Sequence, residues 1–211
     1  MYKRLGLSLL MTALMGCSAS ADEQSRISRV LSSITQFQEP EEELVIEEVN
    51  EVEEVLVPEQ RWIGSNFTEN ELATLNFLQD QGIKDRMALS VILGNIKQES
   101  KFHPNICEGG ARVPYDRCYR GGFGLVQWTT SFRYWGLGNH AKTINGDPST
   151  LPTQLSYLVT EREWKKALWR FKTPDKSLDF YMKGAYVWLG WGIYGNRGYF
   201  SQNYYDRLSL G

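Results

Sequence analysis

The chain has 211 residues, which allows one domain of ordinary size with appendages. Aromatic residues make up 13% of it, enough for a hydrophobic core or a sugar-binding cleft. The net charge of −2 is unevenly divided, because residues 1–60 carry 4 basic and 12 acidic side chains and residues 61–211 carry 19 and 13. The basic part indicates an anionic partner. Nucleic acid is disfavoured, because no recognition motif accompanies the basic charge.

Residues 1–16 are predicted to be a signal peptide. A short positive segment precedes an apolar segment that is too short to span a bilayer at about 20 residues. The sequence LMGC that ends at Cys17 resembles the lipobox of bacterial lipoproteins, although Met15 is uncommon in that pattern. The resemblance implies that Cys17 is lipidated and anchors the protein to a membrane, facing the periplasm or cell wall. Ordinary cleavage after Ala21 and an uncleaved anchor are the alternatives, and in each case the domain is exported.

Residues 17–60 are predicted to form a flexible acidic linker. The segment Glu39–Gln60 contains ten acidic residues and no basic one. Val45, Val49, Val52 and Leu56 follow a coiled-coil spacing, so a short acidic coiled coil is an alternative. Glutamates four residues apart repel each other, however, and two heptads are few. We therefore favour a solvated, self-repelling spacer.

Two further cysteines lie in the part of the chain that we expect to fold. With Cys17 assigned to the lipid, Cys107 and Cys118 remain as a pair in an oxidising compartment, which predicts a disulfide. Two free thiols, or a zinc site that also uses His103, are the alternatives, but the spacing is not that of a zinc finger. The sequence predicts no metal and no cofactor.

Residues 61–211 are predicted to be predominantly α-helical. A capping box at residues 68–71 begins a helix that stops at Gly82, and a second helix begins near Lys84. No segment shows a convincing strand pattern, in which apolar and polar residues alternate. The one exception is the segment between the cysteines, where we expect a small β-hairpin. The fold class is therefore α+β. The remaining predicted helices run from Leu125 through Leu137, from Leu151 towards Phe171, from Thr173 through Ala185 and from Ser201 to Leu208.

Glu99 lies on the apolar stripe of the second helix, at its carboxyl end. Partial burial and the negative end of the helix dipole would both raise its pKa. A carboxylic acid that stays protonated near neutral pH is what general-acid cleavage of a glycosidic bond requires. The alternative is an exposed glutamate that pairs with Lys101 or Arg133, and periodicity alone does not separate the two.

The segment GFGLVQWT, residues 122–129, has the composition of a sugar-binding wall. Gly124 and its neighbouring glycines allow the backbone to approach a ligand closely. Gln127 offers a donor and an acceptor for an N-acetyl group or a hydroxyl. Trp128 has a flat apolar face for a sugar ring, and the alternative is that it belongs to the core.

Together, GNIKQESKFHPN (residues 94–105) and GFGLVQWT resemble the two signatures of the lysozyme-like superfamily, and are most similar to the phage tail lysozyme domain. Goose-type lysozymes and lytic transglycosylases are more distant relatives. The resemblance covers residues 66–208. It implies that residues 61–211 form a lysozyme-like catalytic domain, with a small β-hairpin lobe beside the catalytic cleft.

The resemblance implies a peptidoglycan hydrolase that cleaves the β-1,4 bond between N-acetylmuramic acid and N-acetylglucosamine. Glu99 would be the general acid, Ser100 and Gln127 would hold the substrate, and Tyr186 would cover the acid. Glycan strands are the implied partner, together with virion tail proteins if the protein is part of a phage particle. The related transglycosylases use one glutamate and the sugar's own 6-hydroxyl, so hydrolysis and transglycosylation both stay open.

The second carboxylate is not assigned, and Glu108 and Asp116 are the nearest candidates in sequence. A non-catalytic peptidoglycan-binding lipoprotein with the same fold is the main alternative to an enzyme. A cysteine amidase or peptidase that uses Cys107 and His140 is disfavoured, because Cys118 gives Cys107 a disulfide partner.

Overall fold

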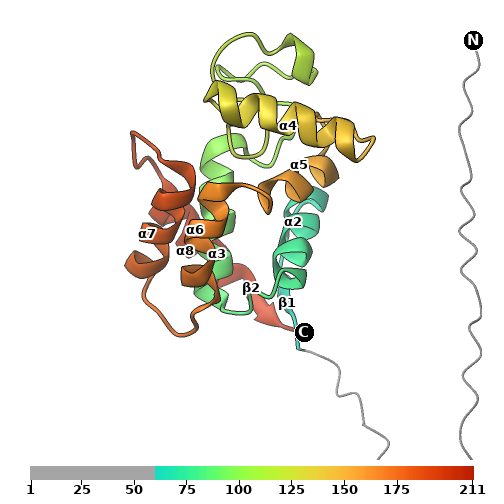
Figure 1. Cartoon of the computed structure of the whole chain (residues 1–211). Helices are drawn as coiled ribbons and strands as arrows, with labels where there is room; N and C mark the ends of the chain where they lie inside the picture. The colour runs from blue at the N-terminus through green and yellow to red at the C-terminus, as the bar shows by residue number, and fades with distance from the viewer. Residues whose placement is uncertain (1–59) are drawn as a thin grey trace, which may run out of the picture. The chain divides into compact units, whose positions relative to one another are not determined.

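The computed structural model describes residues 60–211. The predicted signal peptide, the lipidation of Cys17 and almost all of the acidic linker lie outside the described residues. The described elements, in chain order, are β1 (Trp62–Gly64), α2 (Glu69–Asp80), α3 (Arg86–Ser100), the 3₁₀ turn η1 (Tyr115–Arg117), α4 (Ser131–Thr143), α5 (Leu151–Leu158), α6 (Arg162–Lys172), α7 (Leu178–Leu189), α8 (Arg197–Arg207) and β2 (Leu208–Leu210). The predicted α+β class, mostly helical, is confirmed (Figure 1).

Helix α3 is the central element of the described chain. Every residue from Ala88 to Ile96 is buried, including Ser90 and Asn95. A helix that is buried on all sides needs neighbours on all sides. Helices α2, α6, α7 and α8 supply them, and Figure 1 shows α3 between α2 on one side and α6–α8 on the other. The residue that ends this helix is therefore held by the whole core.

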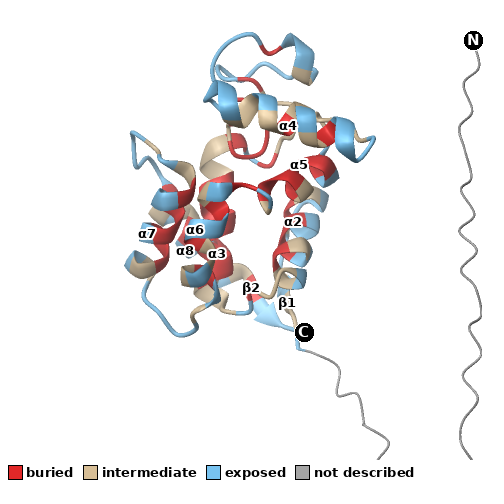
Figure 2. Cartoon of the chain, in the orientation of Figure 1, coloured by how far each residue is buried: buried red, intermediate tan, exposed pale blue. Residues whose placement is uncertain are grey.

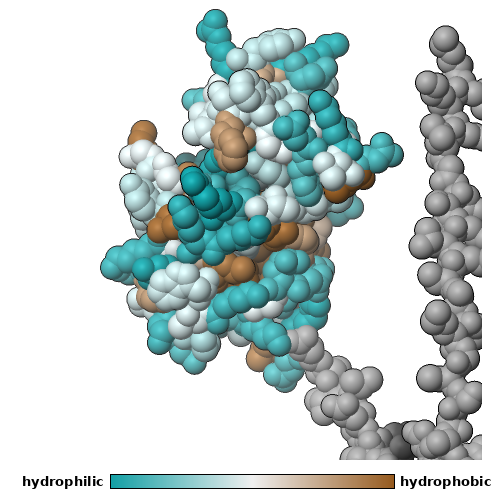
Figure 3. All heavy atoms as spheres, viewed as in Figure 1, coloured by the Kyte–Doolittle hydropathy of each residue, from teal (hydrophilic) through white to brown (hydrophobic). Residues whose placement is uncertain are grey.

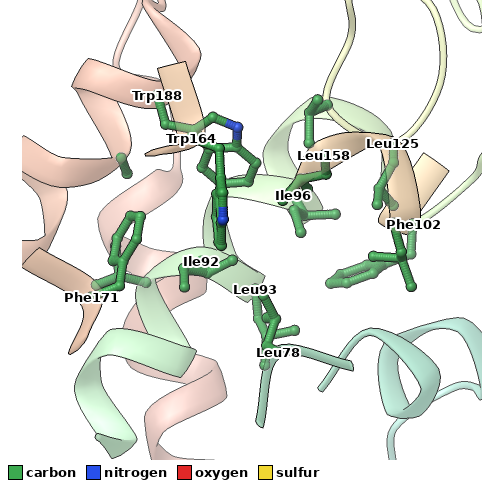
Figure 4. Packing of buried hydrophobic residues seen from close by; sticks show 14 of the residues in the cluster. Leu78, Ile92, Leu93, Ile96, Phe102, Leu125, Leu158, Trp164, Phe171 and Trp188 are labelled. Carbon is green, nitrogen blue, oxygen red and sulfur yellow. The ribbon is translucent and has the colours of Figure 1, made fainter. Parts of the chain in front are cut away.

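The core is aromatic and continuous. Figure 4 shows Trp164, Trp188 and Phe171 grouped near Ile92, where Trp164 and Trp188 pack edge to face with ring centroids 4.8 Å apart. Figure 2 shows that the buried residues line the inward faces of the helices. α4 is the exception, because only Leu137 and Ala141 are buried along its length.

Helices α3 and α8 approach each other at Gly94. A Cβ atom at this position would lie 2.5 Å from the backbone nitrogen of Ser201, so only glycine fits. The contact fixes the distance between the two helices. It therefore also fixes where Arg197, at the start of α8, lies relative to the carboxyl end of α3.

A buried polar cluster joins α2, α3 and α8. Glu71 accepts hydrogen bonds from the hydroxyl of Tyr204 and, at 3.0 Å, from Lys97. It also completes the predicted capping box with Thr68, which is confirmed. Burial raises the pKa of Glu71, but the bonds from Tyr204, the Thr68 backbone and Lys97 outweigh burial and lower the pKa to about 2.

The strand pair of the described chain does not lie where the sequence pattern placed it. β1 and β2 pair antiparallel, with Trp62 opposite Leu210, and so join the two ends of the described chain. Among the described residues, no hairpin forms between the cysteines, and the segment around them has only isolated bridges, such as Ile106 with Arg112 and Cys107 with Phe123. Glycine-rich turns at residues 109–110 replace the alternating pattern that a hairpin needs.

Two predicted helices have different bounds in the structure. Residues 124–127 form a turn in which Gln127 has a φ of 53°, and α4 begins only at Ser131, where the Thr130 side chain caps it. The predicted long helix from Leu151 is divided at Thr160, whose hydroxyl bonds to the carbonyl of Tyr157. Helix α7 starts later than predicted and α8 earlier.

Within residues 60–211, none of the helices combines the length and the apolar character needed to cross a membrane.

Candidate active site

Glu99 is the penultimate residue of α3, and the chain turns sharply after it. Lys101 and Phe102 both adopt left-handed conformations, with φ of 53° and 63°. The hydroxyl of Ser100 bonds to the carbonyl of Ile96 and accepts the N–H of Phe102, which stabilises this turn. The rigid end of a buried helix therefore carries the Glu99 carboxylate.

The Glu99 side chain lines a cleft of about 740 Å³, within the range of ligand sites. Four other segments form its walls: Glu108 on the loop after α3, residues 126–133, the end of α7 with the turn that follows it (residues 189–193), and the start of α8. The Glu99 side chain is 16% exposed, so it is accessible from the cleft while most of its surface is buried.

Arg197 is the partner of Glu99. One of its terminal nitrogens donates a hydrogen bond of 2.6 Å to Oε1 of Glu99. Burial raises the pKa of Glu99 above its ordinary value, and this effect outweighs the opposing charges of Arg197 and Arg133. The predicted direction of the shift is confirmed, with burial as its leading cause.

The Arg197 side chain is itself buried and held from two sides. Its guanidinium lies 4.5 Å from the ring centroid of Trp191, a residue that also lines the cleft. Its Nε and its other terminal nitrogen have no hydrogen-bond partner within the described residues. The bond to Glu99 is therefore the polar contact that orients this cation.

Arg133 supplies a second positive charge to the cleft wall. It forms a bidentate pair with the buried Glu161, at 2.6 and 2.9 Å. The alternative in which Glu99 pairs directly with Arg133 or Lys101 is therefore wrong, since Arg197 is its partner.

Of the predicted substrate-binding residues, the structure places Gln127 in the cleft. Its side-chain nitrogen donates to the carbonyls of Gly124 and Ile106, which fixes the amide at the cleft wall. Gly124 does not line the cleft. It has a φ of 74°, and a side chain there would collide with Gln154, so the glycine serves the turn.

Three other residues that were predicted to contact substrate do not line this cleft. Trp128 is 0% exposed and packs against Tyr157 in the core, so no face of it is open to a sugar. Ser100 is buried, and its hydroxyl is used by the backbone. Tyr186, which was predicted to cover the acid, lies outside the cleft on the exposed side of α7, and Trp191 is the aromatic residue that lines the cleft beside Arg197.

The two candidates for a second carboxylate are separated by the fold. Glu108 lines the same cleft as Glu99, and its Oε2 accepts the N–H of Gly122 at 3.0 Å. Asp116 lies in η1 and borders other cavities. Glu108 is thus the carboxylate that shares the cleft.

Cys107 and Cys118 form the predicted disulfide. The bond removes both sulfurs as zinc ligands and removes Cys107 as a nucleophile. His140 bonds to the hydroxyl of Ser156, away from either cysteine. Within residues 60–211 no cluster of three potential metal-binding side chains occurs.

The sequence analysis missed Arg197 and Trp191. Both are far from Glu99 in the chain and lie in no recognisable motif. The one available signal was Gly190 after an apolar helix, which marks the chain reversal that brings this segment back to the cleft.

A mostly helical fold with a half-buried glutamate at the end of its central helix, facing a polar cleft, defines a lysozyme-like protein. The family model for phage tail lysozyme matches residues 69–187, and the chain belongs to this family. Membership indicates a lysozyme-type glycosidase that acts on peptidoglycan. No curated protein matches the chain.

Proposed function

We propose that this protein cleaves the β-1,4 bond between N-acetylmuramic acid and N-acetylglucosamine in peptidoglycan, with Glu99 as the general acid. The observation that carries the proposal is the position of Glu99 in the cleft, together with a pKa raised by burial. A raised pKa keeps the carboxyl protonated closer to neutral pH, where it can donate to the leaving oxygen.

Arg197 has a defined part in this proposal. Burial raises the pKa of Glu99 and so favours its protonated form before the reaction. As the proton passes to the glycosidic oxygen, Glu99 becomes an anion, and the hydrogen bond from Arg197 becomes a stronger, charge-assisted bond. Arg197 therefore stabilises the product of the proton transfer more than its starting state, which is the condition for catalysis.

Glu108 is the proposed second carboxylate for a hydrolytic reaction. It lines the cleft, and the one hydrogen bond that its side chain makes among the described residues uses only Oε2. Glu108 would activate water or attack the sugar directly. The alternative reaction is lytic transglycosylation, in which the sugar's own 6-hydroxyl attacks and no second carboxylate is needed.

The first experiment is zymography on purified peptidoglycan with wild type and Glu99→Gln. We expect a clear zone for wild type and a loss of activity of about 10²–10⁴-fold for the variant. Glu163→Gln, which changes an exposed pair with Arg162, is the matched control and should stay active. Equal clearing by wild type and Glu99→Gln would contradict the proposal. No clearing by either protein would favour the non-catalytic wall-binding alternative.

The second experiment distinguishes the two reactions. Mass spectrometry of wild-type products should show muramic acid with a free reducing end, and Glu108→Gln should lower the rate. Anhydro products, lighter by one water, together with an active Glu108→Gln variant, would instead establish transglycosylation.

We also propose that residues 17–60 tether residues 61–211 after export. Mass analysis of the mature amino terminus tests this, because a diacylated Cys17 and an unmodified chain that begins after Ala21 differ in mass. Whether the protein acts in a virion or in a host envelope follows from the same measurement on purified particles and on cells.

A further inference from the structure

A second cavity, of about 930 Å³, adjoins the candidate active cleft. The two share Thr129 as a lining residue. Gly121 lines the second cavity, and the next residue, Gly122, donates its N–H to Glu108 in the active cleft. One short segment therefore forms a common wall, and an extended ligand could pass from one cavity into the other.

The second cavity carries two large exposed aromatic side chains. Trp135 on α4 is 65% exposed and Tyr119 on the loop after η1 is 84% exposed. Neither packs on another aromatic ring among the described residues, although many aromatic rings of the domain do. Figure 2 shows the outer face of α4 as exposed. These rings therefore take no part in the aromatic packing of the core, and they give the rim of the cavity two open aromatic faces on which a ligand can stack.

Polar groups surround the rings. Three polar residues line the same cavity: Asp116, Asn139 and Lys142. They provide hydrogen-bond acceptors and donors, one negative charge and one positive charge. In the upper part of Figure 3, where α4 lies, hydrophilic and neutral colours predominate and brown residues are few. A lipid or an apolar helix would need continuous apolar surface. A pyranose ring, with one apolar face and a rim of hydroxyl and N-acetyl groups, matches isolated aromatic rings among polar side chains.

We propose that this second cavity is an accessory glycan-binding groove that holds the peptidoglycan strand beyond the cleavage site, with Trp135 stacking on a sugar ring. The inference rests on the proposed function, since it takes the same strand as the ligand. Binding in the groove lowers the dissociation constant for long strands, and a short oligosaccharide that fills only the active cleft does not reach Trp135.

The test measures binding rather than cleavage, in a Glu99→Gln background so that strands stay intact. Calorimetry compares peptide-free glycan strands, peptide-bearing strands and a muramic-acid tetrasaccharide. Trp135→Ala should weaken binding of both kinds of strand by about three- to tenfold and leave tetrasaccharide binding unchanged. Trp169→Ala is the matched control, because Trp169 is similarly exposed (56%) but lies on α6 and lines neither cavity.

The outcomes separate this inference from the proposed function. Unchanged strand affinity in Trp135→Ala, or no measurable binding of strands at all, overturns the groove. An effect restricted to peptide-bearing strands overturns the glycan as its ligand and assigns the stem peptide. Equal weakening by Trp169→Ala shows a general effect of removing an exposed tryptophan and also overturns it. The zymogram of Glu99→Gln is independent of all these results, so a failure of the glycosidase proposal is recognised separately.

Discussion

Glu99 and Arg197 are joined by a hydrogen bond of 2.6 Å, although the two residues are 98 positions apart in the chain. The glutamate ends α3 and the arginine begins α8, so the bond connects the two helices that pack at Gly94. The geometry of the proposed acid is therefore set by helix packing and not by a local loop.

Replacing Arg197 by methionine should move the alkaline limb of the pH–rate profile to higher pH. A general acid works only when protonated, so activity falls as the pH rises through the pKa of Glu99. The charge of Arg197 favours the carboxylate form of Glu99 and lowers its pKa. Removing the Arg197 charge should therefore raise the pKa of Glu99. The measurement is kcat/KM against pH on soluble glycan strands.

Arg162→Met is the control for this experiment, since Arg162 pairs with Glu163 at the surface. Its alkaline limb should coincide with that of wild type. A limb that stays in place or moves to lower pH in Arg197→Met would show that Glu99 does not act as the acid.

Gly94→Ala should lower both stability and activity. The added methyl would lie 2.5 Å from the backbone of Ser201, and backbone cannot yield as a flexible side chain can. Overpacking of this kind costs about 1–3 kcal/mol of unfolding free energy. Because α8 must shift, Arg197 also loses its alignment with Glu99. Urea denaturation and zymography measure the two effects.

Gly184→Ala provides the comparison, because Gly184 is also a helical glycine and its nearest neighbours, at 3.3 Å, are side chains of α6. Helix propensity favours alanine by up to about 1 kcal/mol at both sites. We expect Gly184→Ala to be neutral or mildly stabilising and fully active. Similar losses of stability and activity in both variants would show that the close contact of α3 with α8 at Gly94 is not the cause.

Glu71→Gln should destabilise the fold at neutral pH and have little effect near pH 2. The folded-state pKa of Glu71 is about 2, against an ordinary value of 4.5. A lowered carboxyl pKa stabilises the fold fully above about pH 4.5, and this contribution disappears as the pH falls towards 2. The shift corresponds to about 3 kcal/mol at pH 7. Urea denaturation at several pH values should show that the difference in unfolding free energy between wild type and Glu71→Gln shrinks as the pH falls.

Glu69→Gln is the control, because Glu69 lies on the exposed side of the same helix. Its unfolding free energy should differ from that of wild type by less than about 0.5 kcal/mol at any pH.

Reduction of the Cys107–Cys118 disulfide should lower stability by about 2–4 kcal/mol. Glu108 directly follows Cys107, so an unrestrained loop should also reduce activity. Thermal unfolding with and without reductant measures the first effect, and zymography the second. The Cys107→Ser, Cys118→Ser double variant should have the melting temperature of reduced wild type. Adding reductant should not change that temperature. If reductant also lowers its melting temperature, the disulfide is not the cause.

The position of Glu99 could be predicted because it depends on one helix. Its distance of three and seven residues from Ile96 and Ile92 places it on the buried stripe, and the pKa shift follows from burial. Arg197 could not be predicted, because its contact with Glu99 depends on how α8 packs against α3. Local periodicity carries no information about that crossing.

The errors at Ser100 and Trp128 have local causes. A serine in the last turn of a helix can bond to the carbonyl four residues earlier, and the hydroxyl of Ser100 does so. Gln127 adopts a left-handed conformation, which turns the next side chain inwards and buries Trp128. Residue type allowed both side chains to contact sugar, but the backbone conformation places neither of them in the lining of the cleft.

The strand pair β1–β2 brings residue 62 and residue 210 together, and the indole of Trp62 bonds to the carbonyl of Lys84, just before α3. Glu99 lies at the opposite end of that helix, about 20 Å away. Both ends of the described domain are thus attachment points remote from the candidate active cleft. A reporter or an immobilising tag could be fused at either end and still leave the cleft open to an insoluble substrate.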